Sequence, residues 1–323
     1  MTPGALRSFA LRSTTGLEAT ILAQGATLMR LRAPDGRGQL GDVVLGFDDP
    51  RAYADPHPYV GGIVGRFANR IANARFAIDG RIHALIANDG PHCLHGGAIG
   101  FDRVVWQAES RGDAAVELRH RSVAGDQGFP GTLDARVVYR LEADSLRIEL
   151  RATTDAPTVV SLASHVYWNL EDAGATSALA HRLTIAAHGY TPVDASLIPT
   201  GEIAPVTGTR FDFRSERTID GDYDHNFALD AAPPGTRVAR LVAPRSGRSL
   251  ALRTTLPGLQ LYTGDCFDGR RAFRDGVRTP RSGAIALEAQ QFPNAPNEAR
   301  FPSARLDPGE TYAHEIVYQL GVV

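Results

Sequence analysis

The chain has 323 residues, a formal net charge of -2 and no run of basic residues, so it lacks the positive surface that nucleic acids and anionic membranes require. Hydrophobic residues make up 43% and charged residues 22%, which allows a packed core and excludes the composition of a disordered chain. We therefore expect a globular protein that binds a small neutral or polar molecule, with no nucleic-acid or membrane partner.

Lysine is absent, and all 34 basic residues are arginines. This excludes Schiff-base and pyridoxal enzymes and the GKS/GKT phosphate loop, because each needs a lysine amine. The two cysteines, Cys93 and Cys266, lie far apart and form no CxxC pair, so we expect free thiols. No apolar run has the length of a signal peptide core or a membrane span, and the expected location is the cytoplasm.

Period-2 alternation of apolar residues is the dominant pattern along the chain. It predicts strands with one buried face at 116–118, 146–150 and 250–252. Turn signals separate such segments, as hairpins require, at 34–36, 79–80, 124–126, 233–235 and 246–247.

No segment carries a sustained helical stripe, and the best candidates for short helices are 215–218 and 268–274. With 33 glycines and 20 prolines the chain is expected to be all-β, a large antiparallel β-sandwich with few short helices. No composition break marks a linker, so residues 1–323 are predicted to form a single domain, as a monomer or a homodimer.

Six glycine-bracketed polar segments are the candidate functional sites, at 65–71, 88–97, 164–170, 224–227, 258–264 and 287–293. In the first two, Arg70 and His95 could each hydrogen-bond substrate hydroxyls, although an arginine is more often a surface residue. The His-Gly-Gly run at 95–97 favours a close backbone approach.

The later segments offer an acid, a base and an apolar wall. His165 follows an apolar stretch at what should be the end of a strand, where a structural histidine is the alternative. Tyr167 and Trp168 read either as core aromatics or as a wall for a sugar ring. Asp224 could bind two hydroxyls or shape a turn. Glu288 shares a strand face with Gln290, and a buried carboxylate there must be paired or functional.

A metal site and a serine nucleophile are both unsupported. The 10 histidines form neither HxH nor HExxH, and His92 with His95 is the one close pair. No GxSxG occurs. We expect neither a metal nor a cofactor.

Taken in order, the segments resemble the aldose 1-epimerase (galactose mutarotase) family over roughly residues 61–292. The matching motifs are GRFANRI at 65–71, NDGPHCLHGG at 88–97, GFDRVVW at 100–106, YTPVDASLIPTGEI at 190–203 and DHNF at 224–227. The resemblance implies the family's β-supersandwich with an open sugar cleft. It also implies that Glu288 is the base and His165 the acid. By the same matching, Arg70, His95, Asp224 and Gln260 hold substrate hydroxyls, and Asn69 assists.

The implied reaction is the exchange of α and β anomers of a free aldose such as galactose or glucose. It needs only one base and one acid, and an ionised Glu288 with a protonated His165 is the expected pair. The chain departs from the family's usual motifs at positions that flank the site, which bears on sugar preference: His92, Cys93, Ser164, Ala289 and Gln291.

Three alternatives remain open at this stage. The first is a non-catalytic carbohydrate-binding protein, since a fold does not fix a function. The second is another carbohydrate-active enzyme, such as a hydrolase that uses Glu288 and Asp224 as its two carboxylates. The third is an epimerase of phosphorylated sugars, which would need arginines that converge on the site.

Overall fold

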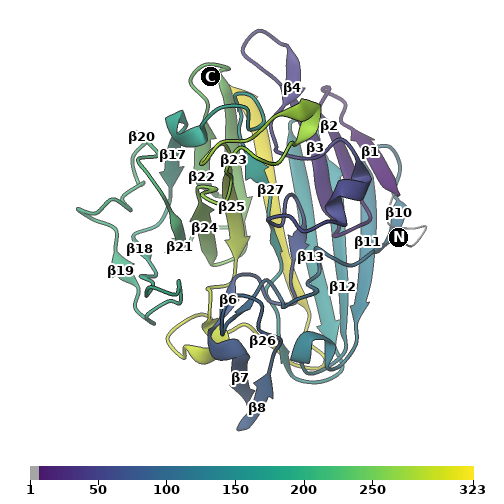
Figure 1. Cartoon of the computed structure of the whole chain (residues 1–323), viewed down its shortest axis with the longest axis vertical. Helices are drawn as coiled ribbons and strands as arrows, with labels where there is room; N and C mark the ends of the chain where they lie inside the picture. Colours follow the sequence, from purple (N-terminus) through teal and green to yellow (C-terminus); the bar gives the residue numbers. More distant parts are fainter. Residues whose placement is uncertain (1–6) are drawn as a thin grey trace.

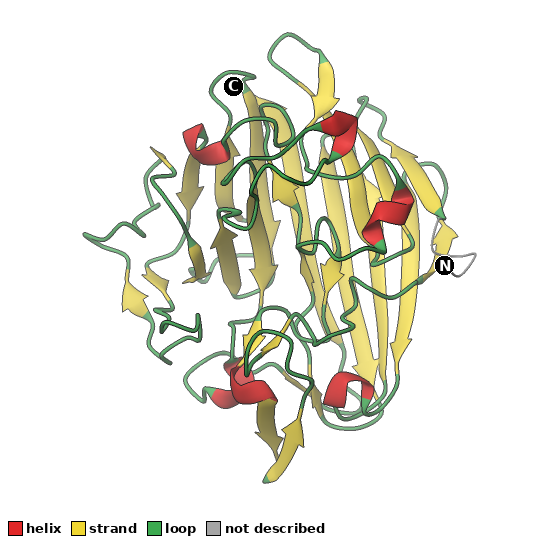
Figure 2. Cartoon of the chain, viewed as in Figure 1, coloured by secondary structure: helices red, strands yellow, loops and turns green. Residues whose placement is uncertain are grey.

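The computed structural model describes residues 7–323, and strands are the dominant regular secondary structure of this part of the chain (Figure 2). These residues contain no α-helix; their helical segments are single 3₁₀ turns at Pro50–Tyr53, Ala72–Ala74, Asp126–Gly128, Ala178–Ala180, Arg274–Gly276 and Ala295–Asn297. No helix in this range is long and apolar enough to cross a membrane.

The largest sheet has nine strands, and every neighbouring pair in it is antiparallel. Figure 1 shows β10 to β13 and β27 side by side in this broad layer. In spatial order its strands are β10 (Gln107–Ser110), β11 (Ala115–Ser122), β12 (Leu133–Leu141), β13 (Ser145–Thr154), β27 (Tyr312–Val322), β23 (Arg248–Thr254), β22 (Arg237–Val242), β17 (Arg182–Ile185) and β20 (Arg217–Thr218).

A six-stranded antiparallel sheet forms the second layer, with the order β16 (Tyr167–Trp168), β25 (Ile285–Gln290), β24 (Gly258–Tyr262), β21 (Asp224–Ala228), β18 (Gly189–Tyr190) and β19 (Ala204–Pro205). A four-stranded sheet contains β1 (Ser8–Arg12), β2 (Glu18–Leu22), β3 (Thr27–Pro34) and β4 (Leu40–Asp42). Short pairs complete the fold: β5 (Ile63–Val64) with β15 (Ala163–Ser164), β6 (Arg70–Ile71) with β9 (Cys93–Leu94), β7 (Arg75–Ile78) with β8 (Arg81–Ala84), and β14 (Thr158–Val159) with β26 (Arg305–Leu306).

One apolar cluster joins the three larger sheets. It runs from Leu11 to Leu320 and includes the inward faces of β13, β24, β25 and β27. Trp168 of the six-stranded sheet lies 4.8 Å, ring to ring, from Tyr318 of the nine-stranded sheet. The predicted all-β antiparallel sandwich is therefore confirmed, and this shared core is the basis on which we propose a single domain.

The predicted strands and turns are found where the alternation placed them. The segments 116–118, 146–150 and 250–252 lie in β11, β13 and β23. The Asp79-Gly80 turn joins β7 to β8 with φ of 50° and 77°, the doubly positive conformation that a type I′ hairpin requires.

The two predicted helices are wrong. Residues 217–218 form β20, which pairs with β17. Within 268–274 the side chain of Asp268 accepts a hydrogen bond from the backbone of Arg270, and Gly269 has a φ of 74°, so local turn chemistry prevents a helix. A single 3₁₀ turn begins only at Arg274.

Candidate active site

A cavity of about 430 Å³ opens over the polar face of the six-stranded sheet, within the size range of small-molecule sites. Six of the seven predicted site residues line it: Asn69, Arg70, His95, His165, Asp224 and Glu288. The remaining lining residues are Pro58, Tyr59, Leu94, Tyr167, Leu197, Asp222, Tyr223, His225, Tyr262, Asp265 and Cys266.

Glu288 reaches the cavity from the middle of β25. Alternation along this strand directs Glu288 and Gln290 to one face, as predicted, while Leu287 and Ala289 enter the apolar core on the other. The side chain of Glu288 is 2% exposed, and its Oε2 atom has no hydrogen-bond partner. The strand therefore places a carboxylate, nearly free of compensating donors, in a dry position.

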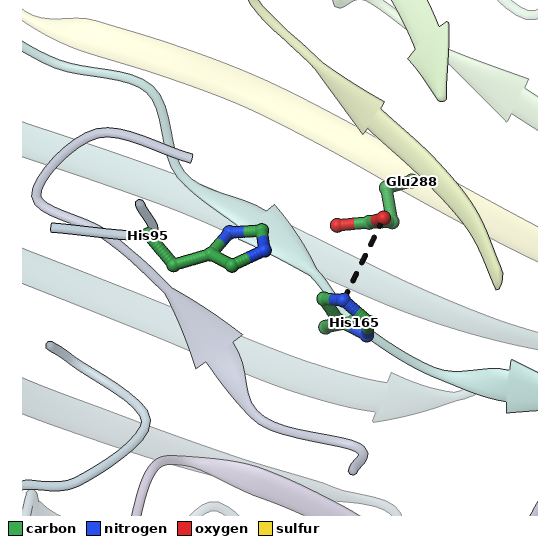
Figure 3. A group of neighbouring side chains, drawn as sticks. All are labelled: His95, His165 and Glu288. Carbon is green, nitrogen blue, oxygen red and sulfur yellow. Dashed lines mark ion pairs between the residues drawn. The ribbon is translucent and has the colours of Figure 1, made fainter. Parts of the chain in front are cut away.

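His165 faces Glu288 from the end of β15, whose pairing with β5 fixes the chain just before it. Its Nε2 atom lies 3.7 Å from Oε1 of Glu288, the contact drawn as a dashed line in Figure 3. Its ring is also buried, and Nδ1 has no hydrogen-bond partner. Two groups able to exchange protons thus meet at the cavity floor.

Burial shifts both pKa values toward the neutral forms. Burial, followed by the charge of Asp224, raises the pKa of Glu288 well above its usual range. Burial lowers the pKa of His165 to about 4. The motifs predicted an ionised glutamate beside a protonated histidine, and the structure instead favours the carboxylic acid and the neutral imidazole. Both arrangements share one titratable proton, which lies on His165 in the first and on Glu288 in the second.

His95 is held as a hydrogen-bond donor. Its Nδ1 atom accepts a hydrogen bond of 3.1 Å from the backbone N–H of Asn69, so Nε2 carries the ring proton. Burial, and then the neighbouring His165 and Arg70, lower the pKa of His95 well below its usual value, which keeps the ring neutral. Gly96 follows with a φ of 92°, and a Cβ there would lie 2.0 Å from the carbonyl oxygen of Gly65. The predicted close backbone approach at 95–97 is confirmed.

His95, His165 and Glu288 are near enough to be considered as metal ligands, since their donor atoms lie within 4.8 Å of one another (Figure 3). A metal at Nε2 of His95 would require that nitrogen's lone pair, and the proton would have to move to Nδ1, where the N–H of Asn69 already points. The donor set therefore fits a hydrogen-bonding site better than a metal site.

Arg70 and Asp224 form the polar side of the cavity. The Nε atom of Arg70 donates to Asp89 at 2.8 Å, and its Nη1 atom lies 3.5 Å from Asp224. Gln260 donates to Asp224 from the neighbouring strand at 2.5 Å. Gln260 thus lies behind Asp224 rather than in the cavity wall, and its direct contact with a hydroxyl stays a prediction.

The charges of the cavity disfavour a phosphorylated ligand. Arg70 is the one arginine among its lining residues, and it is already paired with two carboxylates. The acidic residues that line the cavity are Asp222, Asp224, Asp265 and Glu288. A phosphate group would meet more negative than positive charge, so the arginines do not converge on this site.

The structure separates the two aromatic candidates. Tyr167 lines the cavity beside His165, at a ring distance of 4.9 Å, whereas Trp168 points into the core on the opposite face of β16. The departures from the family motifs, which were expected to bear on sugar preference, do not line the cavity: His92, Cys93, Ser164, Ala289 and Gln291. The free thiols are confirmed, with Cys93 buried and Cys266 at the cavity.

Sequence reasoning missed several lining residues, most clearly Tyr59, Leu197 and Tyr262. Tyr262 lies two residues beyond Gln260 on β24, so strand alternation could have placed it on the same face. Leu197 lies within the matched 190–203 segment but has no chemical group to mark it. Tyr59 follows His57-Pro58 in a segment that carried no motif.

Comparison with known proteins agrees with this arrangement. The aldose 1-epimerase family model matches residues 7–319. The chain is 41% identical to the galactose mutarotase of Sus scrofa, over 96% of this chain and 93% of that protein. It is 38% identical to the aldose 1-epimerase of Escherichia coli K12, over 97% and 94% of the two chains.

Solved structures show the same fold. A GalM/aldose epimerase homologue from C. elegans superposes with a TM-score of 0.94 at 33% identity and covers 98% of this chain and 99% of its own. A galactose 1-epimerase from Lactobacillus acidophilus superposes with a TM-score of 0.85 at 28% identity, covering 97% and 93%. The chain therefore belongs to the aldose 1-epimerase family.

Proposed function

We propose that this protein is a mutarotase that interconverts the α and β anomers of a free aldose such as galactose or glucose, with Glu288 as the base and His165 as the acid. The observation that carries the proposal is the 3.7 Å approach of Nε2 of His165 to Oε1 of Glu288 in a cavity lined by hydroxyl-binding groups. Family membership supports the same reaction.

The reaction needs two proton transfers. Glu288 removes the proton from the O1 hydroxyl while His165 delivers one to the ring oxygen, and the C1 to ring-oxygen bond breaks to give the open-chain aldehyde. After rotation about the C1–C2 bond, the ring closes on the other face of the carbonyl with both transfers reversed. No bond to the protein forms, and no electrons are gained or lost.

The burial of the pair favours the protonation state that ring opening produces. Ring opening leaves Glu288 protonated and His165 neutral, which is the state that burial favours in the empty cavity. A bound ring sugar must therefore stabilise the ionised pair, and its hydroxyls can do so by donating hydrogen bonds to the carboxylate.

Arg70, His95 and Asp224 would hold the sugar hydroxyls, with Asn69 orienting His95 and Gln260 orienting Asp224. The Nε2 atom of His95 donates a hydrogen bond and the carboxylate of Asp224 accepts one, and a hydroxyl can pair with both.

We also propose a monomer or homodimer in the cytoplasm, and the two free thiols support a reducing compartment.

The test is the optical rotation of freshly dissolved α-galactose and α-glucose, followed with wild-type protein, with Glu288→Gln and without protein. Wild type alone should speed the approach to equilibrium. Binding of either sugar without acceleration would favour a carbohydrate-binding protein. Release of a free sugar from a glycoside would favour a hydrolase, but Asp224 is already bound by Gln260 and lies near Arg70, so it is poorly placed to be a nucleophile.

A further inference from the structure

Tyr59 packs against both histidines of the site. Its ring centroid lies 4.4 Å from that of His95 and 5.6 Å from that of His165, and the two histidine rings are 5.2 Å apart. The three rings form a closed triangle at one wall of the cavity. The orientation of either imidazole is therefore restricted by the tyrosine ring.

The backbone of Tyr59 is strained. Its φ is 55°, a left-handed conformation that costs a bulky residue of the order of 1–3 kcal/mol and persists only where the surroundings impose it. Its N–H donates to the carbonyl of His57 at 2.9 Å, and its carbonyl accepts from Gly62 at 3.1 Å. A position that favours glycine thus carries a large aromatic side chain.

The same segment also holds the backbone of His165. The N–H of Gly61 donates to the carbonyl of His165 at 3.0 Å, and the N–H of His165 donates to the carbonyl of Gly62 at 2.9 Å. His165 is therefore bound to this segment through both its backbone and its ring. Any shift of residues 55–62 would move the imidazole relative to Glu288.

Asp102 and Arg103, from a distant segment, hold residues 55–62 in place. Arg103 donates from Nη1 to the carbonyl of Asp55 at 3.1 Å and from Nη2 to that of His57 at 3.2 Å. Its Nε atom lies 3.1 Å from Oδ2 of Asp102, whose side chain is 1% exposed. We call this pair the Asp102–Arg103 clamp. Asp102 also packs on the segment, since a Cβ on Gly62 would lie 2.9 Å from the Cβ of Asp102.

We propose that Tyr59 is a positioning residue whose ring, held in its strained conformation by the Asp102–Arg103 clamp, fixes the orientation of His95 and His165 for proton transfer. This inference rests on the proposed function, because its predicted effect is a change in the rate of anomer exchange. It gives a reason for the strain, because an unstrained glycine at position 59 would remove the aromatic ring that contacts both imidazoles.

The decisive variant is Tyr59→Gly, which relieves the backbone strain while it removes the ring. We expect little net change in stability, because the relief of strain offsets the lost packing of the ring. We expect kcat to fall roughly 10- to 100-fold and KM to stay within about threefold, because misplacement by about 1 Å costs up to about 10² in rate. Tyr59→Phe keeps the ring and should retain most of the activity. A Tyr59→Gly variant with normal kcat, or with a change in KM alone, would overturn the proposal.

The clamp is tested by Arg103→Met alone and combined with Tyr59→Gly. If Arg103 acts through Tyr59, Arg103→Met lowers kcat in the wild-type background and has little further effect once the ring is gone. Effects that multiply in the double variant would contradict the proposal.

Histidine NMR keeps this test independent of the proposed activity. The ring-proton signals of His95 and His165 should shift in Arg103→Met, because Arg103 is bonded to Asp55 and His57 and would reach both rings through Tyr59. Unchanged ring signals would refute the positioning role. If wild type fails to accelerate mutarotation but these signals still shift, the proposed function is wrong while the positioning role stands.

Discussion

Two buried glutamates, one on each large sheet, have opposite surroundings. Glu117 on β11 is 4% exposed and is paired with Arg111, Arg119 and Arg136. Glu288 on β25 is 2% exposed, has one unpartnered oxygen and has His165, at 3.7 Å, as its ion-pair partner. Burial alone would raise the pKa of both carboxyls.

The arginines decide the difference. For Glu117, burial raises the pKa, but hydrogen bonds from Arg136 and Arg119 outweigh it and the net pKa is lowered. For Glu288, burial is reinforced by the charge of Asp224, and Arg70 offsets only part of the rise. A buried carboxylate surrounded by guanidinium groups is thus a structural anion, whereas one left nearly unpaired can exchange a proton.

The largest expected effect is on rate. Glu288→Gln should lower kcat by about 10²–10⁴, because a positioned acid or base contributes that much and an amide cannot take up the O1 proton. Polarimetry with α-galactose measures it. The matched control is Glu117→Gln, which should keep wild-type activity; equal losses in the two variants would erase the distinction between the two sites.

Stability should change in the opposite sense. Glu117→Gln should lower the free energy of unfolding at pH 7 by about 1–3 kcal/mol, because it leaves its arginines uncompensated, although those arginines are partly exposed. Glu288→Gln should leave stability unchanged or raise it, since the amide has no proton to lose. Urea unfolding of both variants tests this, and a destabilised Glu288→Gln would contradict it.

The pH dependence of stability sharpens this contrast. The folded pKa of Glu117 is lowered. Its ionised form therefore contributes to the free energy of unfolding above the unfolded pKa of about 4.3, and this contribution is lost as the pH falls through the folded pKa. The folded pKa of Glu288 is raised above its unfolded value of about 4.3. Between these two pKa values the free energy of unfolding of wild type should fall, relative to that of Glu288→Gln, by up to about 1.4 kcal/mol per pH unit as the pH rises. Urea unfolding curves of wild type and both variants between pH 3 and 9 measure the sign of each pH-dependent contribution.

The pH dependence of activity follows from the shared proton. The active pair holds one proton, so kcat/KM should fall about tenfold per pH unit below about pH 4, where His165 gains a second proton. It should also fall on the alkaline side, above the raised pKa of Glu288. Rates corrected for spontaneous mutarotation give this profile, and an acid limb near the usual histidine pKa of about 6.5 would refute the shift.

The smallest expected effect concerns Asp224, whose carboxylate resembles that of Glu117 because it is already bound. Gln260→Leu removes the 2.5 Å hydrogen bond to Asp224 and should raise KM about 3- to 10-fold with little change in kcat. Gln319→Leu, which removes a similar glutamine-to-aspartate hydrogen bond of 2.7 Å to Asp144 away from the cavity, is the matched control. A kcat loss comparable to that of Glu288→Gln would place Gln260 in the proton-transfer machinery instead.

Much of the fold was predictable because it depends on local pattern. Alternating apolar residues predicted β11, β13 and β23, and Asp-Gly predicted the hairpin between β7 and β8. The helix predicted at 268–274 failed because Asp268 and Gly269 favour a turn whose geometry depends on a side-chain hydrogen bond.

The sequence alone determined which chemical groups the site has, because motifs preserve residue types and their order. Asn69, Arg70, His95, His165, Asp224 and Glu288 were all named before the fold was known, and all line one cavity. The sequence could not show which of these side chains are buried in the core, and so it gave Tyr167 and Trp168 the same two interpretations.

Only the tertiary structure decided the state of those groups. Burial of Glu288 and His165 reversed the expected protonation pattern, and the hydrogen bond from Asn69 fixed His95 as a donor. The Asp102–Arg103 clamp on the segment that contains the strained Tyr59 also depends on hydrogen bonds between residues 46 and 48 positions apart. Proton affinity and strain depend on the solvent and neighbours that the whole fold provides, and a linear sequence does not contain them.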